Sequence, residues 1–258
     1  MECTRGDQAW GCRGIDRAGS GTGDRMILIV ASSWSELVGV EQFPSIDGQR
    51  RSLPNGDMLV AIPIGVGKVQ AALGTAKALE TWKPSHLIGI GTCGAIRQDM
   101  EVGDIVCAGR VVQYDIDLRR FGLPRGSTFD SEGKEAGELV LESPCLRMLH
   151  ELREYRGRKI WERGVLGTAD TFLVASERKD KPWIAEQLHV DAVDMESYAI
   201  VAAGLSCGIP VSIVRTVSDT WRGSRPKSYG KFLVSASQDM CALIAQYAEP
   251  SEKSPTIL

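Results

Sequence analysis

Two acidic segments in the C-terminal half of the chain carry side chains suited to chemistry. The first is VRTVSD, residues 214–219, in which an apolar strand is predicted to end at Val217, with Ser218 and Asp219 at its carboxyl end. Ligands of open α/β sheets bind at the carboxyl ends of the strands, so a carboxyl group at Asp219 can face a ligand. A carboxylate at this position can equally cap the segment that follows. The residues alone leave both roles open.

The second segment is VDMES, residues 193–197, which directly precedes the apolar helical pattern YAIVAAGLSCG. One carboxylate, here Glu196, can accept two hydrogen bonds from the paired hydroxyls of a vicinal diol. An acid in the first turn of a helix is also stabilised by the helix dipole without any ligand. The diol site and the helix start therefore both account for the pattern.

Two glycine motifs need their surroundings to be interpreted. GIGTCG, residues 89–94, matches G-x-G-x-x-G, but no helical apolar pattern follows it, which argues against a dinucleotide site. A tight turn is one alternative, and a loop that brings backbone close to a small ligand is favoured. GVGK, residues 65–68, lacks the other residues of a phosphate-binding P-loop. A turn that leads into a helix is favoured there over a substrate loop.

The elements that must position these residues alternate between strand and helix from Met26 onward. Several strands, such as LIGIG and VSIVRTV, are apolar at consecutive positions, which indicates burial on both faces. We therefore predict an α/β fold, a three-layer α/β/α sandwich with a central, mixed, twisted sheet. The expected strands are 27–31, 58–64, 86–91, 104–112, 163–168 and 212–217, and the expected helices are 68–82, 144–155, 181–187, 196–207 and 229–247. A loop is expected over 119–137.

Composition excludes several classes of protein. The 258 residues carry a formal net charge of −3, without the basic excess of nucleic-acid-binding domains, so no nucleic acid partner is expected. No apolar stretch approaches the ~20 residues of a membrane span. Seven scattered cysteines and three histidines favour reduced thiols in a cytoplasm and argue against a disulfide framework or a zinc site.

The domain boundaries follow from the same patterns. Residues 1–25 are Gly-rich and charged without an apolar period, which predicts a disordered and dispensable leader. Residues 26–248 are expected to form one domain, and residues 249–258 a tail.

The order and spacing of several segments together resemble the purine nucleoside phosphorylase and nucleosidase superfamily, and most closely its methylthioadenosine/S-adenosylhomocysteine nucleosidases. The resemblance covers about residues 26–245. The segments that carry it are GVGKVQAALGTAKALE, KPSHLIGIGTCGAI, VGDIV, YDIDLRRFG, GTADTFL, VDMES and VRTVSD.

The resemblance implies a role for each matching residue. Asp219 would protonate or hydrogen-bond N7 of a purine so that the base leaves as a neutral molecule, and Ser218 would orient Asp219. Met195 and Glu196 would hold the ribose, with Glu196 on its 2′- and 3′-hydroxyls. Arg215 would support these carboxylates from the strand below.

The remaining roles are also taken from the resemblance. Phe172 would stack on the base and the backbone of Leu173 would hydrogen-bond it, while Thr92 and Gly94 would line the ribose and water pocket. Leu118 and Phe121 would contact the 5′ substituent of a substrate bound to the neighbouring subunit, which implies a homodimer. No cofactor and no metal are implied.

Hydrolysis is expected over phosphorolysis. Hexameric bacterial phosphorylases of the family carry a phosphate-binding Arg where this chain has Gly89. Nucleosidases carry an acid after the first strand that deprotonates water, and Glu36 is the candidate here, although it could also be a carboxylate at a helix start. The implied function is hydrolysis of methylthioadenosine, S-adenosylhomocysteine or 5′-deoxyadenosine to free base and sugar, with water as co-substrate.

Three alternatives stay open. Futalosine hydrolysis is the same reaction on a hypoxanthine nucleoside, phosphorolysis needs phosphate, and a nucleoside-binding module would lack turnover. The chain departs from the nucleosidase pattern in TWRG after Asp219 and in ASSWSE after the first strand. Both changes flank the expected pocket and leave the 5′ group of the substrate open.

Overall fold

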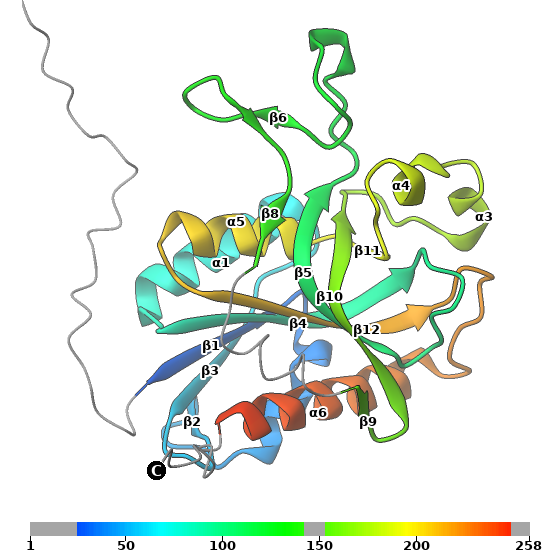
Figure 1. The fold of residues 1–258 in the computed structure, drawn as a ribbon. Coiled ribbons are helices and arrows are strands. Elements are labelled where there is room, and N and C mark those ends of the chain that lie inside the picture. The colour runs from blue at the N-terminus through cyan, green and yellow to red at the C-terminus, as the bar shows by residue number, and fades with distance from the viewer. Residues whose placement is uncertain (1–24, 142–152, 249–258) are drawn as a thin grey trace, which may run out of the picture.

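The computed structural model describes residues 25–141 and 153–248, and a mixed sheet of ten strands forms its centre (Figure 1). The strands are β1 (Met26–Ala31), β2 (Arg50–Ser52), β3 (Met58–Pro63), β4 (His86–Ala95), β5 (Ile105–Gln113), β8 (Leu139–Val140), β9 (Glu154–Tyr155), β10 (Arg158–Thr168), β11 (Ala192–Asp194) and β12 (Val211–Asp219). The α-helices are α1 (Lys68–Trp82), α3 (Ala175–Arg178), α4 (Trp183–Glu186), α5 (Ser197–Ser206) and α6 (Tyr229–Ala248). Short 3₁₀ helices are η1 (Trp34–Glu36), η2 (Val38–Gln42) and η3 (Arg119–Phe121).

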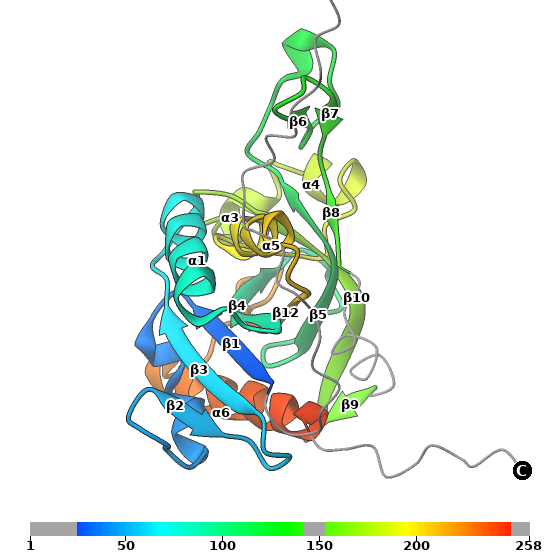
Figure 2. The same ribbon diagram turned by 90° about the vertical axis from the view of Figure 1, so that its left-hand side faces the viewer.

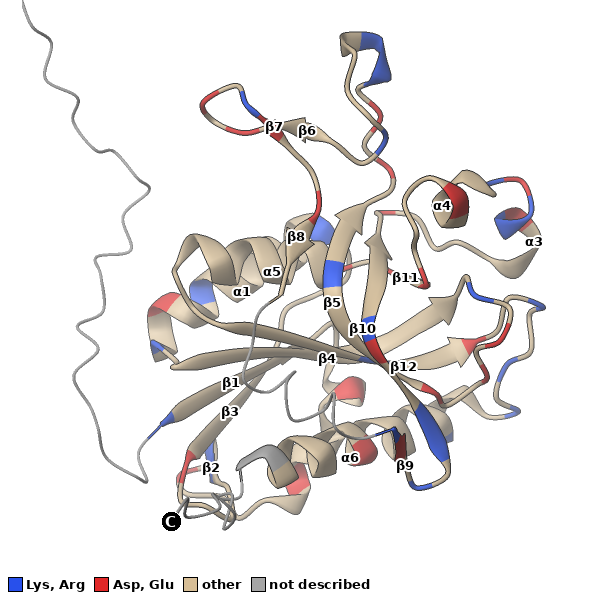
Figure 3. Cartoon of the chain, viewed as in Figure 1, with Lys and Arg blue, Asp and Glu red and all other residues tan. Residues whose placement is uncertain are grey.

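Helices cover both faces of this sheet. Helices α1 and α5 lie on one face, and α6 lies on the other beside η1 and η2 (Figures 1 and 2). All nine residues of β12 are buried, as its apolar sequence predicts for a strand covered on both sides. Charged residues lie mostly on the loops and helices (Figure 3). The predicted α/β class and the mixed, helix-covered sheet are confirmed.

The sheet curls further than an open sandwich does. Its order is β11-β10-β5-β12-β4-β1-β3-β2, with β8 beside β5 and β9 beside β10. Strand β11 pairs in parallel with β10 and antiparallel with β4, so these five strands (β4, β12, β5, β10 and β11) close into a ring. The closure places Val193 opposite Gly94 and so carries the DMES segment to the carboxyl end of β4.

The segment 89–94 is not the loop that the sequence favoured. It lies within β4, which pairs with β12 along its length, so that expectation is wrong. The glycines make room for neighbouring side chains. A Cβ at Gly89 would lie 2.6 Å from Cδ1 of Ile213, and a Cβ at Gly91 would lie 2.1 Å from Nη1 of Arg215. Small residues are therefore needed for packing within the sheet.

The helix predicted over 68–82 is α1, and it ends where Lys83 adopts the left-handed conformation (φ 46°) before Pro84. The helix expected over 144–155 lies mostly outside the described residues. At its end it is wrong, because Glu154–Tyr155 forms β9 and pairs with β10. Arg156 and Gly157 have φ angles of 50° and 75°, which suits a two-residue hairpin turn.

The long loop between β5 and β8 projects from the body of the protein (Figures 1 and 2). It contains η3 and a hairpin of β6 (Thr128–Phe129) and β7 (Glu135–Ala136). The expected leader, residues 1–25, lies outside the described residues except for Arg25. Arg25 forms an ion pair of 2.8 Å with the buried Asp57.

Candidate active site

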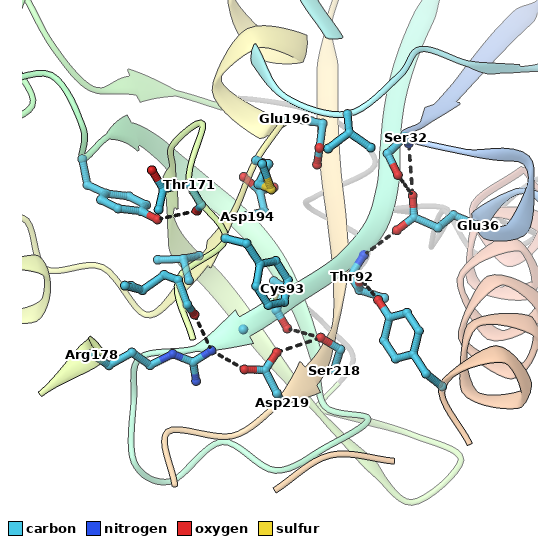
Figure 4. Close-up of a pocket in the computed structure, with 18 residues that line it drawn as sticks. Ser32, Glu36, Thr92, Cys93, Thr171, Arg178, Asp194, Glu196, Ser218 and Asp219 are labelled. Carbon is cyan, nitrogen blue, oxygen red and sulfur yellow. Dashed lines mark hydrogen bonds and ion pairs between the residues drawn. The ribbon is translucent and has the colours of Figure 1, made fainter. Parts of the chain in front are cut away.

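A cavity of about 210 Å³ opens at the carboxyl ends of β4 and β12 (Figure 4). Most of the predicted site residues line it, although they come from five separate parts of the chain. Those in its wall are Glu36, Thr92, Gly94, Phe172, Leu173, Met195, Glu196, Ser218 and Asp219. Local motifs found in the sequence are thus brought together around one space.

Asp219 lies at one end of the cavity and is 4% exposed. The pairing of β12 with β4 is irregular between Val217 and Asp219, and such a bulge redirects the side chains beside it. The Ser218 hydroxyl donates to Oδ1 of Asp219 at 3.0 Å and also lies 3.2 Å from the carbonyl oxygen of Cys93. The neighbouring serine therefore restrains the carboxyl group, as expected for an orienting residue.

Arg178 contacts the other oxygen of Asp219, and the sequence did not indicate it. Its guanidinium forms a buried ion pair with Oδ2 of Asp219 and lines the same cavity. The residue is 1% exposed although it lies in the charged run SERKD, a composition typical of a solvated helix. Only the tertiary fold turns this one member of the run inward.

Glu196 lies in a different part of the cavity wall, at the start of α5. Its Oε1 accepts a hydrogen bond from the backbone N–H of Gly67 at 3.1 Å, and Nη2 of Arg215 lies 3.9 Å from its Oε2. Burial is the main cause that raises the pKa of Glu196 from 4.5 to about 7, and the charge of Arg215 opposes it. Glu196 can therefore change its charge near neutral pH.

Asp194 performs the helix-start role that Glu196 could have had. Its Oδ1 accepts the backbone N–H of Ser197 at 3.2 Å and the hydroxyl of Thr168 at 2.7 Å. Its Oδ2 accepts Nε of Arg215 at 2.8 Å. This satisfies the start of α5 and leaves Glu196 to face the cavity.

Arg215 lies beneath the cavity and does not line it. It is 1% exposed, and its Nη1 donates to the carbonyl oxygen of Ile90 at 2.6 Å. With its other nitrogens it binds Asp194 and the hydroxyl of Ser197. The structure thus places Arg215 below the DMES segment, in contact with Asp194, which is the position expected for a residue that supports the carboxylates.

Glu36 lies in η1 and is 7% exposed. Its Oε2 accepts the backbone N–H of Ser32 at 3.1 Å and also the Ser32 hydroxyl, and its Oε1 accepts the backbone N–H of Thr92 at 3.2 Å. Helix α6 holds the backbone here, because Ser237 Oγ donates to the carbonyl oxygen of Glu36 at 2.6 Å. The carboxylate is therefore fixed beside Thr92 (Figure 4).

Aromatic side chains form the rim. Phe172 is 64% exposed although it lines the cavity, which leaves its ring accessible to a ligand. Tyr229, the first residue of α6, lies on the same rim, and its hydroxyl is 3.3 Å from Oγ1 of Thr92. The sequence did not single out Tyr229, because a tyrosine at a helix start carries no signal of its own.

The GVGK segment forms the turn that the sequence favoured, and it lies at the cavity. Gly65 and Gly67 have φ angles of 87° and 85°, and α1 begins at Lys68, as a turn before a helix requires. The segment also reaches the site, because Val66 lines the cavity and the N–H of Gly67 binds Glu196.

Leu118 and Phe121 lie apart from this cavity. Both belong to the projecting loop between β5 and β8, and Phe121 is 74% exposed. The expected contact of these two residues with a neighbouring subunit stays a prediction.

Among the described residues there is no cluster of His, Cys, Asp and Glu that could hold a metal ion. Nor does any helix in the described part of the chain have the length and apolarity to cross a membrane.

Comparison with known proteins places this architecture. The family model of the phosphorylase superfamily matches residues 20–249. The 5′-methylthioadenosine/S-adenosylhomocysteine nucleosidase of Actinobacillus succinogenes is 30% identical over 196 residues, which cover 74% of this chain and 80% of that protein.

Solved structures share the fold. The Campylobacter jejuni 5′-methylthioadenosine/S-adenosyl homocysteine nucleosidase has a TM-score of 0.74 at 20% identity, over 87% of this chain and 99% of that chain. A mutant of the Helicobacter pylori futalosine hydrolase has a TM-score of 0.70 at 20% identity, over 86% of this chain and 99% of that chain. From the family match, the sequence relatives and the shared fold, the chain belongs to the phosphorylase superfamily.

Proposed function

We propose that this protein hydrolyses the N-glycosidic bond of a 5′-modified purine nucleoside and releases the free base and the free sugar. The observation that carries the proposal is the placement of three carboxyl groups, those of Asp219, Glu36 and Glu196, around one cavity. Glycoside hydrolysis needs an acid on the leaving group and a base on water. The names of the sequence relatives support the same reaction class.

The acid is assigned to Asp219. The C1′–N9 bond breaks, its electron pair moves to the purine, and the proton of Asp219 passes to N7. The base then leaves as a neutral molecule. Phe172, with its exposed ring at the rim, would stack on the purine, and the backbone of Leu173 lies in the same wall to hydrogen-bond its edge.

Water activation is assigned to Glu36. Its carboxylate takes a proton from water while the water oxygen forms the new bond to C1′. Glu196 would hold the 2′- and 3′-hydroxyls, since its carboxylate form can accept two hydrogen bonds. Thr92, Gly94 and Met195 line the same cavity, and they would contact the ribose.

The charges of the cavity favour water over phosphate as the attacking group. Among the described residues that line it, Arg178 is the only lysine or arginine, and it is engaged by Asp219. Glu36 and Glu196 would repel a phosphate anion bound next to the sugar. The family resemblance further supports a homodimer in which Leu118 and Phe121 of one subunit reach the 5′ group of a substrate held by its partner.

A panel of nucleosides tests the reaction and its substrate. Methylthioadenosine, S-adenosylhomocysteine, 5′-deoxyadenosine, futalosine and inosine are each incubated with and without phosphate, and free base and free sugar are measured. Release of base and unphosphorylated sugar without phosphate supports hydrolysis, and the fastest substrate identifies the 5′ group. A strict need for phosphate, with a sugar phosphate as product, would show phosphorolysis. Tight binding of the nucleosides without any product would show a binding module.

A further inference from the structure

Arg178 uses its terminal nitrogens completely. Nη1 donates to the carbonyl oxygens of Ala95 at 2.9 Å and Thr220 at 2.8 Å. Nη2 donates to the carbonyl oxygen of Leu173 at 3.2 Å and to Oδ2 of Asp219. Each of these nitrogens carries two protons, so neither has a proton left for a substrate. Its Nε–H has no hydrogen-bond partner among the described residues, but this atom is buried and does not reach the open cavity. We therefore expect Arg178 to influence a reaction through the groups that its terminal nitrogens hold.

Those groups all lie around Asp219, at one end of the cavity. Ala95 ends β4, Asp219 ends β12, and Leu173 lies in the segment that follows β10. The guanidinium thus joins three separate parts of the wall at one point. Its position also depends on Gly94, because a Cβ there would lie 2.4 Å from Nη2 of Arg178. The backbone of the cavity floor leaves space for this cation and for nothing larger than hydrogen at Gly94.

We propose that Arg178 is a positioning residue for the acid, a role that rests on the proposed function. It holds Oδ2 of Asp219 while Ser218 restrains Oδ1, so the carboxyl group is fixed through both oxygens in the cavity wall. The guanidinium favours the carboxylate form of Asp219, so the proton that this acid gives to N7 is one that it takes up from solvent when the nucleoside binds. When Asp219 gives its proton to N7 it becomes a carboxylate, and a guanidinium in direct contact favours that product.

A purely structural role makes a different prediction. A buried arginine that bonds three backbone carbonyls could serve only to hold the wall together. Its loss would then lower stability and activity whether or not residue 219 can donate a proton. If Arg178 instead acts through Asp219, its loss has little to remove once the proton donor is gone.

A double-mutant cycle separates the two roles. Arg178→Met and Arg178→Lys are made in the wild-type protein and in Asp219→Asn, and kcat and KM for the best nucleoside of the panel are measured for each. We expect Arg178→Met to lower kcat about a hundredfold with a much smaller change in KM. Arg178→Lys should recover much of that loss, because it keeps a positive charge. When it is added to Asp219→Asn, Arg178→Met should lower kcat by a further factor of less than about two.

Two results would overturn the proposal. Equal losses of kcat from Arg178→Met in both backgrounds would show that Arg178 does not act through Asp219. A kcat unchanged in Arg178→Met would show that it does not act at all. Thermal unfolding of each variant accompanies the kinetics, and Arg178→Lys keeps the test valid if Arg178→Met fails to fold. Absence of nucleoside cleavage by the wild type is a separate result, which would remove the proposed function and this role with it.

Discussion

The two ends of the cavity hold carboxyl groups in different surroundings. We call the end at Asp219, where the purine base is proposed to bind, the base end, and the end at Glu36 and Glu196 the sugar end. At the base end, Asp219 contacts a buried guanidinium directly. At the sugar end, Glu36 is bound by backbone N–H groups and a hydroxyl, and the nearest nitrogen of Arg215 stays 3.9 Å from Glu196. The contrast teaches that carboxyl groups of nearly equal burial differ in what stabilises their charge. This difference suits the roles proposed for them, in which Asp219 gives up a proton, Glu36 accepts one and Glu196 binds hydroxyls.

The largest effect should come from removing the proton at the base end. Asp219→Asn keeps the shape of the side chain but cannot donate an acidic proton, so we expect kcat to fall by about 10²–10⁴-fold. Binding of a non-hydrolysable nucleoside analogue, measured by calorimetry, should be largely kept. The matched control is Asp180→Asn, at an exposed position. Turnover close to that of the wild type would remove Asp219 from the mechanism.

The corresponding change at the sugar end is Glu36→Gln. Without a carboxylate to accept a proton from water, kcat should fall by about a hundredfold. Steady-state release of free base measures the effect, and Glu41→Gln, at an exposed site of η2, is the control. If Glu36→Gln keeps full activity, a different group activates water and the assignment of this end is wrong.

Gly94→Ala tests how tightly the base end is packed. The added Cβ would lie 2.4 Å from Nη2 of Arg178 and 3.2 Å from Oδ2 of Asp219, so both groups must move. Overpacking of this kind costs about 1–3 kcal/mol in the free energy of unfolding, measured with urea, and kcat should fall as well. Gly230→Ala is the control, since nothing lies within 4 Å of its Cβ position. Equal behaviour of the two variants would contradict the packing described here.

The pH dependence distinguishes the sugar end from the base end. In the proposed role, only the carboxylate form of Glu196 would accept both ribose hydroxyls, and the pKa of Glu196 is raised to about 7. We therefore expect KM to rise as pH falls below about 7, by up to about tenfold per pH unit. Glu196→Gln should have a high KM that no longer varies over this range. A wild-type KM that is constant from pH 5 to pH 8 would argue against this role.

The same raised pKa has a consequence for stability. The folded protein binds the Glu196 proton more tightly than the unfolded chain does. This contribution to stability is complete below the ordinary pKa of 4.5 and is lost as pH rises through about 7. Urea denaturation of wild type and Glu196→Gln across this range should show a decline with pH that the variant lacks.

The smallest effect on the stability of the folded chain is expected on the projecting loop, away from both ends of the cavity. Phe121 is 74% exposed on the projecting loop, so Phe121→Ala should change the free energy of unfolding by less than about 0.5 kcal/mol. If it reaches a partner's substrate, KM should rise for nucleosides with long 5′ groups. Phe129→Ala, on the same loop, is the comparison variant. No change in KM for any 5′ group would count against the partner contact.

The parts of the site that could be predicted lie in local motifs. Asp219 ends a strand whose apolar run is visible in the sequence, and Glu196 directly precedes the apolar pattern of α5. Helix α1 begins and ends where its glycine and proline predict. Arg178 could not be predicted in this way. Its inward position depends on contacts with β4 and β12, whose residues lie 83 and 41 positions away.

The segment 89–94 shows a different limit of prediction. Its glycines favoured a loop because glycine is common where backbone turns. In the structure they occupy a strand, and the space they leave is filled by Ile213, Arg215 and Arg178. The need for small residues was visible in the sequence, but the neighbours that impose it were not.

The placement of α6 bears on when, during synthesis, the segment around Glu36 gains its full support. This last described helix supplies Tyr229 to the rim, and its Ser237 bonds the backbone of both Glu36 and Gly39. The segment that holds Glu36 is made early in synthesis, whereas the helix that supports it is made much later. A nascent chain that still lacks α6 also lacks the hydrogen bonds from Ser237 to Glu36 and Gly39, so this segment has its full support only once the C-terminal helix has been made.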